Sequence, residues 1–171
     1  MSDLTTDRLV LRSWPAGEVS AVVAGGSRFP HWAEDFPAEG DRVIAGFIAG
    51  HPGTPGQRQI VERATGLVVG SVGLFPPADG TIEFGYGIVP SRRGRGYASE
   101  AARAIAAFAL TAPDIHTVSA RVELSNPASA RVLEKAGLTR VSADAGTALF
   151  QATAPLPEPS PGSLPSPQPA S

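Results

Sequence analysis

The stretch PSRRGRGYAS, residues 90–99, places three arginines and two glycines between a run typical of a β-strand and a run typical of an α-helix. A helix N-terminus has unsatisfied backbone N–H groups and carries roughly half a positive charge. Gly94 and Gly96 would let the main chain approach an anion without a Cβ in the way. Arginine can donate to two phosphate oxygens at once. The stretch therefore predicts a turn that holds phosphate groups, and a pyrophosphate in particular.

Two widespread phosphate-binding motifs do not fit this stretch. A Walker A loop requires G-x-x-x-x-G-K-[ST], but the only lysine in the chain is Lys135. A Rossmann turn requires G-x-G-x-x-G, and Ser99 stands where the third glycine should be. Asp114 comes at the right distance for the ribose-binding acid, but it precedes the next predicted strand instead of ending it.

Composition narrows the classes of protein that remain. The chain has 171 residues and a formal net charge of -2, which suits one globular domain and argues against a nucleic-acid partner. It has no cysteine, so thiolate nucleophiles and disulfides are excluded. The histidines His31, His51 and His116 are far apart, so we expect no metal site. The start, MSDLTTDRLVLRSW, is unlike a signal peptide, and no apolar run approaches the roughly 20 residues that span a bilayer. We expect a cytoplasmic protein without a membrane segment.

Hydrophobic periodicity predicts an α+β domain over residues 1–154. Alternating apolar residues predict strands at 8–14, 59–63, 67–75, 81–89, 116–124, 138–142 and 147–153. Apolar residues with a helical period predict helices after Pro15, at 41–50, at 97–110 and from Pro127, where Asn126 is a good N-cap. Residues 29–37 are aromatic and punctuated by proline, so we expect a loop there. Residues 155–171 form a Pro/Ser-rich tail that we expect to be disordered.

The segments GYGIVPSRRGRGYASEA (85–101) and VELSNPASARVLEKAGL (122–138) resemble the GNAT superfamily of acetyl-CoA-dependent N-acetyltransferases. The opening LTTDRLVLRSW (4–14) resembles the first strand of its ribosomal-protein N-acetyltransferase (RimJ/RimL) branch. The family pattern [Q/R]-x-x-G-x-[G/A] matches Arg93, Gly96 and Ala98. The resemblance implies the GNAT fold, a mixed and mostly antiparallel sheet flanked by helices, in which two parallel strands splay apart to hold the cofactor.

The resemblance also implies a cofactor site. Backbone N–H groups from Gly94 to Ser99 would bind the pyrophosphate of acetyl-CoA, whereas Asn126 and Ser129 would face the pantetheine arm and its sulfur. The strand that ends at Ile88 and Val89 would offer main-chain groups to the same arm. The complete set of implied cofactor-binding residues is Ile88, Val89, Arg93, Gly94, Arg95, Gly96, Tyr97, Ala98, Ser99 and Asn126. The implied reaction is direct attack of an amine on the thioester, without an acyl-enzyme and without a metal.

Glu83 and Ser129 are the predicted catalytic residues. Glu83 would take a proton from the attacking ammonium, although it could equally be an acid on the solvated face of a strand. Glu123, on the partner strand, is the second candidate for the base. The Ser129 hydroxyl would donate a hydrogen bond to the leaving thiolate, or Ser129 could be a small residue that permits close packing.

The acceptor is left open by the sequence. The resemblance implies that the acceptor is recognised at residues 29–37, here called the acceptor loop, where Glu34 and Asp35 could attract an ammonium group. The acceptor would be a small-molecule amine or a peptide N-terminus, and the protein a monomer or homodimer. The alternative from another functional class is a catalytically silent acyl-CoA-binding or regulatory module of the same fold.

Overall fold

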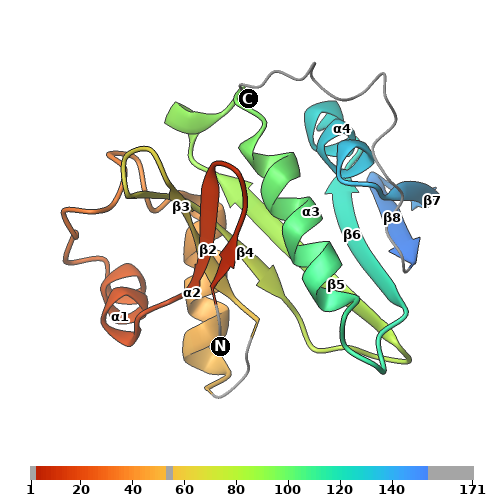
Figure 1. Cartoon of the computed structure of the whole chain (residues 1–171), viewed down its shortest axis with the longest axis horizontal. Helices are drawn as coiled ribbons and strands as arrows, with labels where there is room; N and C mark the ends of the chain where they lie inside the picture. The colour runs from red at the N-terminus through yellow and green to blue at the C-terminus, as the bar shows by residue number, and fades with distance from the viewer. Residues whose placement is uncertain (1–2, 53–55, 154–171) are drawn as a thin grey trace.

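The computed structural model describes residues 3–52 and 56–153, which form a sheet of eight strands flanked by helices (Figure 1). The strands are β1 (Leu4–Thr5), β2 (Leu9–Ser13), β3 (Arg58–Glu62), β4 (Leu67–Leu74), β5 (Thr81–Ile88), β6 (Thr117–Glu123), β7 (Thr139–Asp144) and β8 (Thr147–Thr153). The helices are α1 (Ala16–Ala24), α2 (Glu39–Gly50), α3 (Tyr97–Ala109) and α4 (Pro127–Lys135), with a 3₁₀ turn at Pro90–Arg92. The predicted tail, 155–171, lies outside the described residues.

The sheet is mixed and mostly antiparallel, as the sequence led us to expect. Its order is β1-β2-β3-β4-β5-β6-β8-β7, and β5 with β6 is the parallel pair. Pairing between β5 and β6 starts at Thr81↔Thr117 and stops at Glu83↔Ser119. Beyond that point the two strands are no longer paired, so the second half of β5 is open on its β6 side. The predicted splay is therefore confirmed.

Helices cover both faces of the sheet. The Tyr86 hydroxyl is hydrogen-bonded to Ser129 of α4. Ser71 of β4 pairs with the residue that follows Tyr86 on β5, and its hydroxyl donates to Asp41 of α2. Because neighbouring residues of a strand point to opposite faces, α4 and α2 lie on opposite faces. Figure 1 shows α3 on the same face as α4, between β2 and β6. None of the helices within residues 3–52 and 56–153 is both long and apolar enough to cross a membrane.

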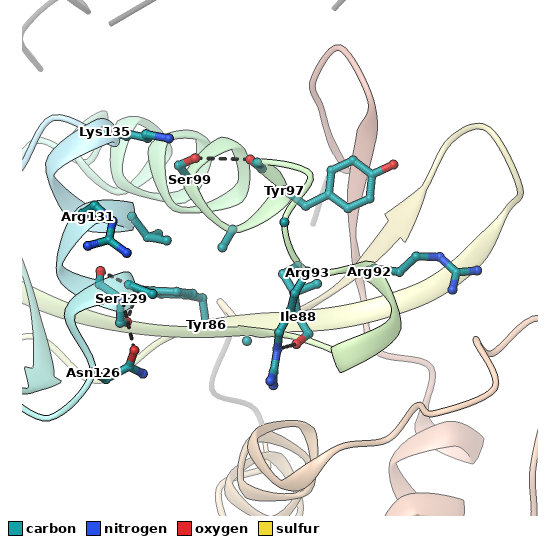
Figure 2. A pocket seen from close by; sticks show the side chains of 16 residues that line it. Tyr86, Ile88, Arg92, Arg93, Tyr97, Ser99, Asn126, Ser129, Arg131 and Lys135 are labelled. Carbon is teal, nitrogen blue, oxygen red and sulfur yellow. Dashed lines mark hydrogen bonds between the residues drawn. The ribbon is translucent and has the colours of Figure 1, made fainter.

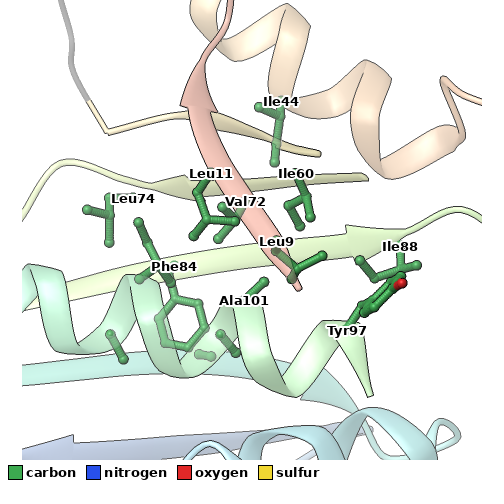
Figure 3. Close-up of a cluster of buried hydrophobic side chains, with 14 of the residues drawn as sticks. Leu9, Leu11, Ile44, Ile60, Val72, Leu74, Phe84, Ile88, Tyr97 and Ala101 are labelled. Atoms are coloured by element: carbon green, nitrogen blue, oxygen red, sulfur yellow. The ribbon is translucent and has the colours of Figure 1, made fainter. Parts of the chain in front are cut away.

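Helix α3 packs against the sheet through small residues. Figure 3 shows Ala101 facing Leu9 and Phe84 in the core. The buried stripe of α3 consists of Tyr97, Ala101, Ala102, Ile105, Ala106 and Ala109. The sequence had also predicted Phe108 in this stripe, but it is 37% exposed and covers the guanidinium of Arg58 at 4.7 Å instead. Alanines let the helix axis approach the sheet closely, which brings the N-terminus of α3 to the open half of β5.

Candidate active site

A cavity of about 600 Å³ lies where β5 separates from β6, a volume typical of a small-molecule site. Figure 2 shows its walls: β5 and the turn that follows it on one side, α4 on the other, and the start of α3 above. Its lining residues are Tyr86, Gly87, Ile88, Arg92, Arg93, Gly94, Gly96, Tyr97, Ala98, Ser99, Asn126, Ala128, Ser129, Arg131, Val132 and Lys135.

The charge of this lining is strongly one-sided. Four of the lining residues are cationic, namely Arg92, Arg93, Arg131 and Lys135, and among the described residues that line the cavity none is an aspartate or glutamate. The whole chain, by contrast, has a formal net charge of -2. Positive charge is therefore concentrated at the cavity, which favours an anionic ligand.

Two glycines shape the turn in front of α3. Gly94 (φ 80°) and Gly96 (φ 84°) both adopt left-handed conformations, which cost residues with a Cβ free energy. Gly96 is the N-cap of α3 and accepts the N–H of Glu100 on its carbonyl oxygen. A Cβ at Gly94 would meet open space, whereas one at Gly96 would lie 3.2 Å from Nη2 of Arg8. The main chain is thus unobstructed at Gly94, whereas Arg8 lies beside Gly96.

The arginine side chains of the turn do not all point into the cavity. The Arg95 Nη1 donates to Glu62 Oε2 at 3.1 Å, and the Arg92 Nε donates to Glu62 Oε1 at 3.3 Å. The Arg93 Nε donates to the carbonyl oxygen of Ile88 at 2.9 Å (Figure 2). The charges of Arg92 and Arg95 are therefore paired with a buried carboxylate. This pairing was not evident from the sequence, because Glu62 belongs to β3, which is distant from the turn along the chain.

Ser129 and Asn126 both face the cavity from α4. Asn126 caps the helix as predicted, since its side chain accepts the backbone N–H of Ser129 at 3.2 Å. The Ser129 Oγ lies 2.6 Å from the hydroxyl of Tyr86 (Figure 2). Burial raises the pKa of Tyr86 and outweighs its hydrogen bond to Ser129, so the phenol stays protonated and able to donate.

Comparisons with known proteins agree with this geometry. Residues 8–139 match the acetyltransferase (GNAT) domain, which is more than half of the chain. The chain belongs to the GNAT acetyltransferase family. An N-acetyltransferase of Bacillus subtilis (strain 168), named YjdG and described as uncharacterized, is 35% identical over 80 residues. The matched segment is 46% of this chain and 48% of the relative, so the chain spans about half the length of the curated relative that it matches.

Solved structures of other GNAT proteins share the fold. An acetyltransferase of Bacillus anthracis superposes with a TM-score of 0.66 at 20% identity, over 89% of this chain and 98% of the other. A Vibrio cholerae protein whose assignment as a ribosomal-protein-serine acetyltransferase is provisional gives 0.64 at 19%, over 89% and 97%. A dodecameric spermidine N-acetyltransferase of Vibrio cholerae gives 0.61 at 16%, over 86% and 95%. At these identities the likeness establishes the fold alone.

Most of the cofactor residues predicted for this GNAT chain line the cavity together. They are Ile88, Arg93, Gly94, Gly96, Tyr97, Ala98, Ser99 and Asn126, whereas Val89 and Arg95 are not among the lining residues. The predicted catalytic residue Ser129 lines the cavity too. The sequence reasoning missed Tyr86. It lies two residues from both Phe84 and Ile88, on the same face of β5, and so resembles an ordinary core residue. The sequence reasoning also missed Arg131 and Lys135. Their helical spacing from Ala128 was a usable signal, because residues at i, i+3 and i+7 share one face of a helix.

Glu83 lies outside the residues that line the cavity. It comes three residues before Tyr86 on β5, so its side chain points to the opposite face of the sheet. There it forms an ion pair with Arg121 of β6, with 3.5 Å between Oε2 and Nε, and its side chain is 40% exposed. Glu123 lies two residues beyond Arg121, on the same face and exposed. Both predicted bases therefore stand on the face away from α4, with Glu83 at the last paired position of β5 and Glu123 at the end of β6.

The acceptor loop, residues 29–37, is docked onto the turn that precedes α3. Asp35 accepts both the backbone N–H and the hydroxyl of Ser91, each at 2.7 Å. Burial raises the pKa of Asp35, but the hydrogen bonds from Ser91 outweigh this and its pKa lies below the ordinary value. Glu34 lies 3.5 Å from Arg92. The acids that were expected to attract an ammonium group therefore hold the loop against the turn that precedes α3.

Proposed function

We propose that this protein is an acetyl-CoA-dependent N-acetyltransferase that acetylates a primary amine. One observation carries the proposal: a cavity that opens between splayed strands at the N-terminus of α3 is lined by Arg93, Arg131 and Lys135, besides the Glu62-paired Arg92, and by no described carboxylate. Family membership supplies the class of reaction.

We propose positions for the phosphates, the pantetheine arm and the thioester of acetyl-CoA in the cavity. Backbone N–H groups from Gly94 to Ser99 would bind the pyrophosphate, since a helix N-terminus with glycines in front of it favours anions. Arg131 and Lys135, one helical turn apart on α4, would supply charge for the remaining phosphate oxygens. The pantetheine arm would run along the open edge of β5 at Ile88, with its thioester near Ser129.

The chemistry follows from these positions. The neutral amine attacks the carbonyl carbon of the thioester, a C–N bond forms, the C–S bond breaks and coenzyme A leaves as the thiolate. The Ser129 hydroxyl, hydrogen-bonded by Tyr86, would donate to the sulfur as negative charge develops there. Glu83, on the opposite face, would accept the proton that the amine loses, directly or through water.

Several observations bear on the identity of the acceptor. The resemblance of residues 4–14 to the RimJ/RimL branch, and one structural relative, favour a peptide N-terminus. Other structural relatives are spermidine acetyltransferases. The positive charge of Arg121 next to Glu83 disfavours a polycation as the amine beside Glu83. We therefore propose a peptide N-terminus or another singly charged amine. A monomer or homodimer stays a prediction.

A two-stage experiment tests the function. Acetyl-CoA at a hundredfold excess over its Kd should stabilise the chain by about 2.7 kcal/mol, visible as a rise in melting temperature. Release of the free thiol of coenzyme A is then measured with peptides bearing free N-termini, with spermidine and with small amines. We expect thiol release with at least one peptide. Binding without release across the panel would favour the silent module, and no binding would contradict the proposal altogether.

A further inference from the structure

Glu62, the last residue of β3, is only 2% exposed, yet it takes part in four side-chain hydrogen bonds. Three of the four donors belong to residues 92–97, here called the glycine turn. They are the Arg92 Nε (3.3 Å), the Arg95 Nη1 (3.1 Å) and the Tyr97 hydroxyl (2.8 Å). The fourth donor is the hydroxyl of Thr65, at 2.7 Å, in the hairpin between β3 and β4. One carboxylate thus connects the centre of the sheet to the turn that borders the cavity.

The contacts bracket both flexible points of the glycine turn. Arg92 precedes Gly94, whereas Arg95 and Tyr97 flank Gly96 on its two sides. Glycine has more conformational freedom to lose on ordering than any other residue, so a turn with two of them needs fixed points to keep one shape. All three residues donate to the carboxylate of Glu62, which therefore supplies fixed points on each side of both glycines.

Arg8, the residue before β2, also contacts the glycine turn. Its Nη1 donates to the carbonyl oxygen of Arg95 at 2.7 Å, and its guanidinium lies 4.8 Å from the centre of the Tyr97 ring. Arg8 in turn pairs with Glu100 of α3. The glycine turn is therefore held by side chains from outside the turn, namely Glu62 and Arg8, while Gly94 and Gly96 line the cavity.

A buried carboxylate needs partners for its charge, and Glu62 has them. Burial by itself raises the pKa of Glu62, but hydrogen bonds from Thr65, Tyr97 and Arg92 and the charge of Arg92 outweigh burial, so its pKa lies below the ordinary value. Glu62 is thus ionised at neutral pH. Leaving a buried charge unpaired is costly, which confines Arg92 and Arg95 to positions beside it.

We propose that Glu62 is a positioning residue that pre-organises the glycine turn for the phosphates of coenzyme A. It touches neither the cavity nor the reacting atoms, and it acts through Arg92, Arg95 and Tyr97. This inference rests on the proposed function, because it assigns a role in binding the acyl donor of the same site.

The sign of the effect separates positioning from simple electrostatics. Glu62 is a negative charge close to a site for an anion, so its neutralisation by Glu62→Gln would strengthen coenzyme A binding if charge alone mattered. If Glu62 positions the turn, the same substitution weakens binding, because the loosened turn must be ordered by the ligand. The two explanations predict opposite changes in Kd.

Glu18 provides a matched control. It is also buried, 4% exposed, and it also has several side-chain partners, namely Trp32, Gln59, His31 and Arg12. None of those partners lines the cavity. Glu62→Gln and Glu18→Gln should therefore both lower the melting temperature, but only Glu62→Gln should change the binding of coenzyme A.

The experiment measures the Kd of coenzyme A by calorimetry for the parent and both variants, together with steady-state kinetics. We expect Glu62→Gln to raise the Kd and the KM for acetyl-CoA by about tenfold or more, with kcat at saturation within about a factor of two of the parent. Tyr97→Phe, which removes one partner without changing charge, should raise the Kd severalfold and gives the answer if Glu62→Gln does not fold. A Kd in Glu62→Gln and Tyr97→Phe that equals or is lower than that of the parent overturns the positioning role. A parent that binds no coenzyme A overturns the proposed function as well, which distinguishes the two failures.

Discussion

The hydroxyl of Tyr86 lies 2.6 Å from the Oγ of Ser129, so a residue of β5 and a residue of α4 form a hydroxyl pair at the wall of the cavity. If the tyrosine donates to the serine, the serine proton is free to point toward the leaving sulfur. The two residues would then act in series on one developing charge.

Substitution of this pair should show that dependence. We expect Ser129→Ala to lower kcat roughly 10²-fold, as loss of a donor to a developing charge does. Tyr86→Phe should lower kcat by about tenfold, the worth of one hydrogen bond. Because Tyr86 acts through Ser129, the double variant should be no slower than Ser129→Ala. Effects that multiply in the double variant would show that the two hydroxyls act independently.

Gly96→Ala should weaken binding of acetyl-CoA at least tenfold, because a Cβ at this left-handed position disturbs the turn and meets Arg8. The strain itself should cost about 1–2 kcal/mol of stability. Gly25→Ala is the control, since Gly25 has φ 75°, open space around its Cβ position and no place in the cavity wall. Both variants should melt at lower temperature. Equal affinity for acetyl-CoA in the two would remove Gly96 from the phosphate site.

Arg131→Ala and Lys135→Ala should each raise the KM for acetyl-CoA about tenfold and reduce the salt dependence of binding, because each removes a cation from the cavity wall. The KM for S-acetylpantetheine, a donor without phosphates, should not change. The exposed Arg140→Ala of β7 is the control for loss of one positive charge. A similar loss with both donors would mean that these side chains contact the pantetheine arm or support α4 instead.

Glu83→Gln should lower turnover by roughly 10²–10⁴-fold at pH 6.5, where an α-amine is mostly charged and needs a base. Affinity for acetyl-CoA should be unchanged, since Glu83 lies on the face opposite the cavity. Glu123→Gln on the same face is the comparison. Turnover of Glu83→Gln within a factor of about two of the parent would assign the proton to Glu123 or to solvent.

Asp41→Asn should alter how stability depends on pH. Burial raises the pKa of Asp41, although hydrogen bonds from the Ser71 hydroxyl and the Ala38 N–H oppose this. A carboxyl with a raised folded-state pKa contributes stability that is complete below its ordinary pKa and is lost as the pH rises through the folded value. Asparagine can accept the Ala38 N–H on its Oδ1 and donate from its Nδ2 to the Ser71 hydroxyl, without the charge.

The melting temperature of Asp41→Asn, relative to the parent, should therefore be higher at pH 7 than at pH 4. The exposed Asp144→Asn of β7 should show no such trend. A difference between Asp41→Asn and the parent that stays constant with pH would contradict the assignment.

Local patterns in the sequence were enough to predict the framework of this protein. The alternation of apolar residues located the main strands, and Asn126 with Pro127 located the start of α4, because strand periods and helix caps depend on neighbouring residues. The glycine positions in 90–99 indicated a phosphate turn before any contact was known. The resemblance then added the splay between β5 and β6, which the pairing confirms. Arg93, Gly96 and Ser129 were predicted at the site and do line the cavity.

Only the tertiary structure decided which partners these residues have. Arg92 and Arg95 pair with Glu62, about thirty residues earlier in the chain, because β3 lies two strands from β5 in the sheet. Tyr86 and Glu83 are an odd number of residues apart on β5, so their side chains point to opposite faces of the sheet. Tyr86 therefore contacts Ser129, and Glu83 contacts Arg121. Partners distant in sequence depend on sheet order and register, which the period of a strand does not encode. The sequence by itself therefore determined the elements and the glycine positions of the turn, whereas tertiary packing determined which of its arginines are paired with a carboxylate.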